Sequence, residues 1–335
     1  MSWKTAVYHY VHAKNQAELL GSAEPISPYM KDDGYLQIQQ RRLEQMSGSC
    51  KTRGAQALRS ETKLRFTRVK TTEHGVIAEI EMRRQLHYQI GTATYTEERI
   101  EPERLLLDTY EGKWLVRSAE ALGRERGTSI KHGAFPTIAE AGDQPQRSPS
   151  LPFLNHSILN STESLSRKIR YDREKAVAYA ETWWNRSNPR FMEFEVDCTN
   201  YVSQCLFAGG APMDYTGKRD SGWWFSGKQG SQELWSFSWA VAHSLQSFVT
   251  RSRRGLHGVE VTEPWELQPG DMISYDWDGD GRFQHNAIVT ARDVNGMPLV
   301  NAHTYNSRNR YWDYRDSPAW TERTRYVFVR IADDM

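Results

Sequence analysis

The chain has 335 residues, with 43 Lys and Arg against 42 Asp and Glu and a formal net charge of +1. This length suits two domains, and the balanced charge gives no general case for nucleic-acid binding. No apolar run approaches the roughly 18 residues that a membrane-spanning helix needs. Three cysteines are too few for a disulfide framework, and no CxxC or HExxH pattern supports a zinc site. We therefore expect free thiols and no metal or other cofactor.

The N-terminal segment carries charge and histidine where a signal peptide needs an apolar block. The chain is therefore expected to be cytoplasmic, and a cell-wall location would require an additional leader. The sequence leaves the oligomeric state open.

The first 126 residues predict a small α+β domain. An apolar stripe with a 3.6-residue period from Ala6 to Leu20 ends at Gly21 and predicts one helix, and a second is expected over residues 35–46. After these helices the apolar period changes to two, which is typical of strands. Strands are expected from residue 64 and near residues 78–82, 86–96, 104–110 and 113–119, the last two joined by a hairpin at Glu111–Gly112. Two helices followed by an antiparallel meander resemble the cystatin-like, NTF2-like fold.

The composition of the sequence changes after residue 126. Residues 127–165 mix prolines with Gly, Ser, Asn and Gln and have little apolar periodicity, which predicts a linker. A second domain is then expected over residues 166–335. It begins with a helix over residues 173–185, for which Asp172 is a good N-cap.

Cys198 is the candidate nucleophile. Asp197 is a plausible N-cap, Cys198 falls in the first helical turn, and Gly209 is a natural stop for the helix. The free N–H groups and the dipole at a helix start favour a thiolate and can hold an oxyanion. The alternative is that Cys198 is a buried small hydrophobe, the usual fate of a free cysteine. We assign that role to Cys205.

His285 is the candidate base. It begins a strand after an Asp- and Gly-rich loop at residues 276–282, and Asn301 and His303 lie two residues apart on the next strand, pointing to the same face. Either one is placed to fix the tautomer of His285. The order of Cys at a helix start, His on a strand and a polar residue on the next strand is typical of papain-like enzymes.

The loop at residues 276–281 also resembles the start of a calcium-binding loop. Ala287 stands where such a loop needs a glutamate, so a hairpin turn is the favoured interpretation.

The segment Asp-Cys-Thr-Asn-Tyr-Val-Ser-Gln-Cys-Leu at residues 197–206, the Gly209–Gly210 stop, the Pro-Gly-Asp turn at 269–271 and the His285 strand resemble the putative amidase domain of bacteria over residues 168–331. That domain is related to the NlpC/P60 and CHAP cysteine peptidases. The resemblance implies a papain-like fold with the cysteine-bearing helix packed on an antiparallel sheet. It also implies that Cys198 is the nucleophile, His285 the base, and His303 or Asn301 the orienting residue.

The wider group cleaves amide bonds in cell-wall peptides, so the resemblance implies a peptide or peptidoglycan-fragment substrate. Trp223 and Trp224 lie in a loop-like segment and are candidates for a substrate-stacking wall, with core packing as the alternative. The resulting hypothesis is a thiol amidase or peptidase. Its rivals are a non-catalytic module that binds peptide or glycan, and an enzyme that passes the acyl group to an amine.

Overall fold

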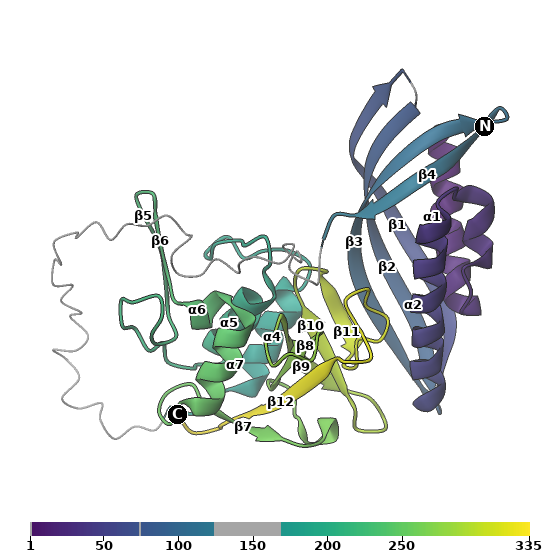
Figure 1. The fold of residues 1–335 in the computed structure, drawn as a ribbon. Helices are drawn as coiled ribbons and strands as arrows, with labels where there is room; N and C mark the ends of the chain where they lie inside the picture. The colour runs from purple at the N-terminus through teal and green to yellow at the C-terminus, as the bar shows by residue number, and fades with distance from the viewer. Residues whose placement is uncertain (1, 74, 124–168) are drawn as a thin grey trace.

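The computed structural model describes residues 2–73, 75–123 and 169–335. The predicted linker at residues 127–165 lies outside the described residues. We call residues 2–123 the N-terminal half and residues 169–335 the C-terminal half. Figure 1 shows them as two parts joined where strand β11 lies beside strand β3.

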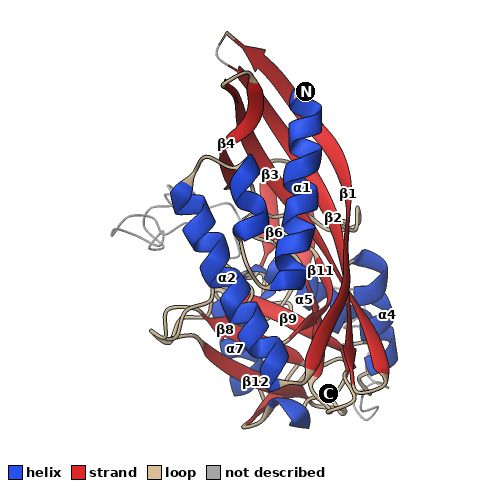
Figure 2. Cartoon of the chain, turned by 90° about the vertical axis from the view of Figure 1, so that its right-hand side faces the viewer, coloured by secondary structure: helices blue, strands red, loops and turns tan. Residues whose placement is uncertain are grey.

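The N-terminal half consists of helices followed by an antiparallel meander, as the sequence predicts. Its elements are α1 (Trp3–Leu20), η1 (Glu24–Tyr29), α2 (Asp33–Thr52), β1 (Ala55–Thr72), β2 (Gly75–Ile90), β3 (Ala93–Tyr110) and β4 (Lys113–Ala121). Figure 2 shows α1 and α2 lying against one face of these strands. The Ser2 side chain accepts a hydrogen bond from the Thr5 N–H at the start of α1, and Gly21 ends the helix in a left-handed conformation with φ 66°.

Several predicted boundaries in this half are wrong. Strand β1 begins at Ala55 and not at residue 64. Helix α2 runs through Gly48 to Thr52 instead of ending at residue 46, because an interior glycine weakens a helix by only about 1 kcal/mol and does not stop it. The predicted strand at residues 86–96 is a hairpin, since β2 ends at Ile90 and β3 begins at Ala93. The predicted hairpin at Glu111–Gly112 is confirmed, with φ 49° and 78° at its two turn residues.

The C-terminal half places four α-helices around the rest of the sheet. Its helices are α4 (Arg173–Trp183), α5 (Cys198–Ala208), α6 (Phe237–Ala240) and α7 (Ala242–Arg251), with the short η3 (Pro264–Glu266). Its strands are β5 (Phe225–Gln229), β6 (Gln232–Trp235), β7 (Gly258–Val261), β8 (Met272–Asp276), β9 (His285–Arg292), β10 (Pro298–Ala302), β11 (Ser307–Tyr311) and β12 (Arg325–Ile331). The predicted N-cap of α4 is confirmed, because the Asp172 carboxylate accepts a hydrogen bond from the Lys175 N–H.

One sheet of ten strands runs through both halves in the order β1-β2-β3-β11-β10-β9-β8-β12-β7, with β4 also paired to β3. The junction pairs Ser307 with Arg99 and Arg308 with Glu98. The strand pairs of this sheet are antiparallel, so the protein is α+β with a large antiparallel sheet.

Alternate residues of β8 and β9 enter two separate cores. Met272 and Ile288 pack with Tyr201 and Val202 of α5. Their neighbours Ile273, Tyr275, Ala287 and Val289 belong to a second cluster that also contains Trp277 and Tyr314. This alternation follows from the two-residue period of a strand and decides which side chains can reach α5. Within the described residues, no helix is long and apolar enough to cross a membrane.

Candidate active site

Cys198 is the first residue of α5 and is 1% exposed. Asp197 precedes it, as predicted, but its carboxylate does not cap an N–H group of α5. Oδ1 instead accepts hydrogen bonds from the Asn200 side chain (2.8 Å) and the Phe194 N–H (3.1 Å), and Oδ2 lies 2.7 Å from Nδ1 of His303. Asp197 therefore ties the start of α5 to the end of β10.

Burial raises the pKa of the Cys198 thiol above its ordinary value. The backbone N–H of Asn286 and the hydroxyl of Thr199 lower the same pKa, and the Thr199 hydroxyl lies 3.7 Å from the sulfur. Burial is the larger effect, and it opposes the thiolate predicted from the helix start.

His285 is the first residue of β9 and is 1% exposed. Its Nε2 lies 3.4 Å from the Tyr314 hydroxyl, and its Nδ1 is buried without a hydrogen-bond partner. The ring packs among Tyr275, Trp277 and Tyr314, with centroids 5.3, 5.8 and 5.3 Å away. Burial, and then the positive charge of Arg310, lower the pKa of His285 to about 3, so the imidazole is neutral at physiological pH.

Cys198 and His285 begin two elements that contact each other, α5 and β9, but no hydrogen bond joins their side chains. Asn286, next to His285, donates to the Thr199 hydroxyl (3.1 Å) and to the carbonyl of Ala242 (3.3 Å), so it faces α5. Because successive strand residues face opposite sides, the His285 ring projects toward the aromatic cluster. The described residues show no hydrogen bond between Cys198 and His285.

Asn301 and His303 are not brought to His285. Asn301 donates to Glu181 (2.8 Å) and accepts from Thr290 (3.0 Å). His303 lies against Asp197 through Nδ1 and 2.8 Å from the Trp183 carbonyl through Nε2, and its ring stacks on Tyr201 at 4.0 Å. Both side chains point toward α4, as their predicted shared face requires.

Neither Asn301 nor His303 orients the imidazole in this structure, because their polar atoms are engaged with α4 and Asp197. The residue that contacts Nε2 of His285 is Tyr314, which sequence reasoning missed. Nothing in its local pattern marks it, since Tyr314 lies in an aromatic-rich turn after β11 that reads as ordinary core.

The prediction that Trp223 and Trp224 form a substrate wall is wrong. Their side chains are 0% and 2% exposed. The indole N–H of Trp223 donates to Ser203 (3.0 Å), and that of Trp224 donates to the carbonyls of Lys218 (3.1 Å) and Ser221 (3.0 Å). Both indole N–H groups have hydrogen-bond partners and both rings are buried in the core, so neither ring can stack on a ligand.

The loop between β8 and β9 is a hairpin connection, as predicted. The carboxylate of Asp276 accepts four backbone N–H groups of its own loop, from Asp278 (3.2 Å), Gly279 (2.8 Å), Asp280 (3.3 Å) and Gly281 (2.8 Å). Those oxygens hold the turn that leads into His285. In the part of the chain that the structure describes, no group of three or more His, Cys, Asp or Glu side chains is arranged to hold a metal ion.

One known protein family matches most of the C-terminal half. Residues 170–329 match the family model described as "Putative amidase domain". That stretch contains α5 with Cys198, β9 with His285 and the sheet between them. The C-terminal half thus resembles a class of hydrolases that cleave amide bonds.

Two Bacillus subtilis (strain 168) proteins are similar to the chain. The uncharacterized protein YhbB is 53% identical over 172 residues, which is 51% of this chain and 54% of that protein. The uncharacterized protein YjcM is 27% identical over 148 residues, 42% of this chain and 32% of that protein. The chain thus spans about half the length of YhbB and about a third of YjcM.

Among solved structures, the intermembrane space region of the chloroplast protein ARC6 aligns with 36% of this chain and 96% of its own, at 15% identity and a TM-score of 0.27. A likeness of this size supports no inference about the fold.

Proposed function

We propose that the C-terminal half is a papain-like, cysteine-dependent amidase with Cys198 as nucleophile and His285 as base. The observation that carries the proposal is the 3.1 Å hydrogen bond from the Asn286 side chain to the Thr199 hydroxyl. It joins the residue after His285 to the residue after Cys198, so the backbone segments that carry the nucleophile and the base lie side by side. The match to an amidase family over residues 170–329 supports the same reaction class.

The unpartnered Nδ1 of His285 supports its role as the base. A buried ring nitrogen without a hydrogen bond is costly and is seldom left so without a reason. In the tautomer that we propose, Nε2–H donates to the Tyr314 oxygen, and Nδ1 carries the lone pair that takes a proton from the sulfur. The described conformation is therefore a closed resting state in which thiol and imidazole are both neutral.

Catalysis requires the imidazole and the sulfur to meet. Because the His285 ring projects away from α5, a rotation of the side chain alone does not bring Nδ1 to Sγ, and we propose that the start of β9 or the first turn of α5 also shifts. Opening of the site to admit substrate would also expose both groups to water and relieve the burial that raises the pKa of Cys198 and lowers that of His285. His285 then takes the thiol proton, and the sulfur attacks the amide carbonyl.

The remaining steps follow acyl-transfer chemistry. The backbone N–H of Cys198 at the start of α5 stabilises the tetrahedral oxyanion. Protonated His285 gives its proton to the leaving amine as the C–N bond breaks, which leaves a thioester on Cys198. Water, activated by His285, hydrolyses the thioester and restores the free thiol.

The substrate that we propose is a peptide, and specifically a peptidoglycan fragment, in keeping with the resemblance to the NlpC/P60 and CHAP peptidases. We further propose a division into an NTF2-like domain at residues 1–126, a linker at 127–165 and the amidase domain at 166–335. The rival binding module loses its main support, because Trp223 and Trp224 are buried.

The test compares Cys198→Ala with Cys205→Ala. Both cysteines lie in α5, both are buried, and burial raises the pKa of each thiol, so Cys205 is a matched control. The variants are incubated with peptidoglycan fragments, and mass spectrometry identifies the cleaved bond. The proposal expects Cys198→Ala to abolish cleavage and Cys205→Ala to retain it. Full cleavage by Cys198→Ala would refute it.

A further inference from the structure

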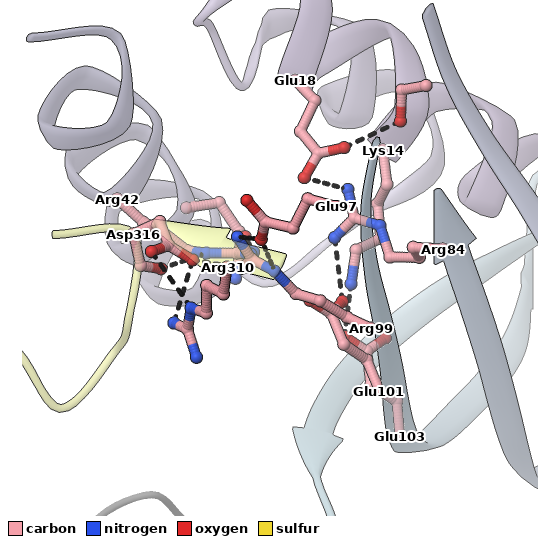
Figure 3. Close-up of polar contacts among 12 residues, drawn as sticks. Lys14, Glu18, Arg42, Arg84, Glu97, Arg99, Glu101, Glu103, Arg310 and Asp316 are labelled. Carbon is pink, nitrogen blue, oxygen red and sulfur yellow. Dashed lines mark hydrogen bonds and ion pairs between the residues drawn. The ribbon is translucent and has the colours of Figure 1, made fainter. Parts of the chain in front are cut away.

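A buried network of ion pairs crosses the junction between the two halves. Asp316, in the turn after β11, pairs with Arg99 of β3 and with Arg310 of β11, the latter at 2.9 Å. Arg42 of α2 donates to the Asp316 carbonyl at 2.7 Å. Figure 3 shows these side chains converging on Asp316, with the ion pairs of the N-terminal half continuing beyond Arg99. Asp316 thus connects two elements of the N-terminal half to β11.

The Asp316 network reaches Tyr314. The Arg310 guanidinium lies 3.7 Å from the centroid of the Tyr314 ring, a close cation–π contact, while the same guanidinium pairs with Asp316. The Tyr314 hydroxyl lies 3.4 Å from Nε2 of His285. A continuous path of contacts therefore runs from Arg99 through Asp316, Arg310 and Tyr314 to the candidate base.

The backbone at Tyr314 indicates that its position is enforced. Tyr314 has φ 53° and is fully buried. A bulky side chain in this left-handed conformation is strained, and such strain persists only where the surroundings hold it. The neighbouring ion pairs of Arg310 and Asp316 supply that constraint.

Resting on the proposed function, we infer that Tyr314 is a positioning residue for His285 and that the N-terminal half contributes to this positioning through Arg99. Among the described residues, the Tyr314 hydroxyl is the one hydrogen-bond partner of the His285 ring. The contact selects which ring nitrogen is left for Cys198. The N-terminal half is then part of the amidase site and not merely attached to it.

The experiment reads the imidazole directly. Full-length protein is labelled with ¹⁵N-histidine, and the signal of His285 is assigned from its loss in His285→Asn. Tyr314→Phe removes only the hydroxyl, so the Nε2 resonance of His285 should shift. Arg99→Gln should shift the same resonance, because it releases Asp316 and, through it, Arg310.

Arg104→Gln is the matched control. Arg104 lies on the same strand as Arg99 and also pairs with glutamates, but it is exposed and takes no part in the junction. Its substitution should leave the His285 signal unchanged. An unchanged signal in Tyr314→Phe would overturn the positioning role, and an unchanged signal in folded Arg99→Gln would overturn the contribution of the N-terminal half.

Two further measurements keep the inference testable. If Arg99→Gln does not fold, the near-isosteric Asp316→Asn tests the same link by weakening the ion pairs on both of its sides. In turnover assays, Tyr314→Phe should lower kcat about tenfold with KM unchanged, because it disturbs the base and not substrate binding. A tenfold rise in KM with kcat unchanged would contradict the positioning role of Tyr314. The spectra do not depend on turnover, so failure of the proposed function, shown by an active Cys198→Ala, is distinguishable.

Discussion

Replacing His303 with alanine is expected to destabilise the fold strongly. The ring lies against two acceptors, the Asp197 carboxylate at 2.7 Å and the Trp183 carbonyl at 2.8 Å, and it stacks on Tyr201 at 4.0 Å. Alanine would leave a buried carboxylate and a buried carbonyl without these contacts. Leaving a buried hydrogen-bonding group without a partner costs about 1–3 kcal/mol, so the two acceptors together cost about 2–6 kcal/mol.

Urea and thermal unfolding monitored by tryptophan fluorescence measure this loss. At about 2–4 °C per kcal/mol for a domain of this size, Tm should fall by roughly 4–24 °C. The matched control is His257→Ala, which loses one contact, a 2.8 Å hydrogen bond to the Gly255 carbonyl in a partly exposed site, and should cost about 1 kcal/mol.

The same variant separates the observed role of His303 from the predicted one. A residue that only oriented the base would lose activity on substitution and keep its stability. If the free energy of unfolding of His303→Ala is within about 1 kcal/mol of the wild-type value while amide hydrolysis disappears, the proposal of a structural role for His303 is wrong.

Two other predictions follow from burial and helix geometry. Because the folded pKa of His285, about 3, lies below its ordinary value of 6.5, the unfolded chain takes up the proton first as pH falls. The contribution of neutral His285 to the free energy of unfolding is therefore complete above pH 6.5 and is lost toward pH 3, by up to about 5 kcal/mol. Unfolding curves of His285→Gln should show a smaller loss of stability in acid. Equal losses in variant and wild type would contradict the burial argument. Gly48 lies inside α2, and a Cβ added there would meet open space. Gly48→Ala should therefore stabilise the protein by about 0.5–1 kcal/mol in urea unfolding. A loss of stability would argue that α2 ends earlier.

Local signals predicted three helix termini correctly because caps and stops act within a few residues. Asp172 begins α4, Gly21 ends α1 and Gly209 follows α5, as their chemistry requires. The long strands β2 and β3 were harder to predict from sequence. Their helix-facing positions carry buried charges such as Arg84 and Glu101, which pair with each other at 2.8 Å, so the apolar alternation is interrupted where the strand continues.

The candidate site shows a similar division. The order of residues places Cys198 at a helix start and His285 at a strand start, and both positions are found in the structure. The side to which the His285 ring points depends on the register of β9 against β8, where a slip of one residue would exchange the two faces. The burial of Trp223 and the contact of Tyr314 arise from packing between distant segments, which no local pattern reports.

Trapping the acyl-enzyme tests the proposed chemistry most directly. The protein is mixed with a cleavable peptidoglycan fragment, quenched in acid during turnover, digested and analysed by mass spectrometry. The account predicts that the peptide containing Cys198 gains the mass of the acyl fragment and that this adduct is absent in His285→Asn. Turnover with no adduct on Cys198, or with the acyl group on another residue, would contradict it.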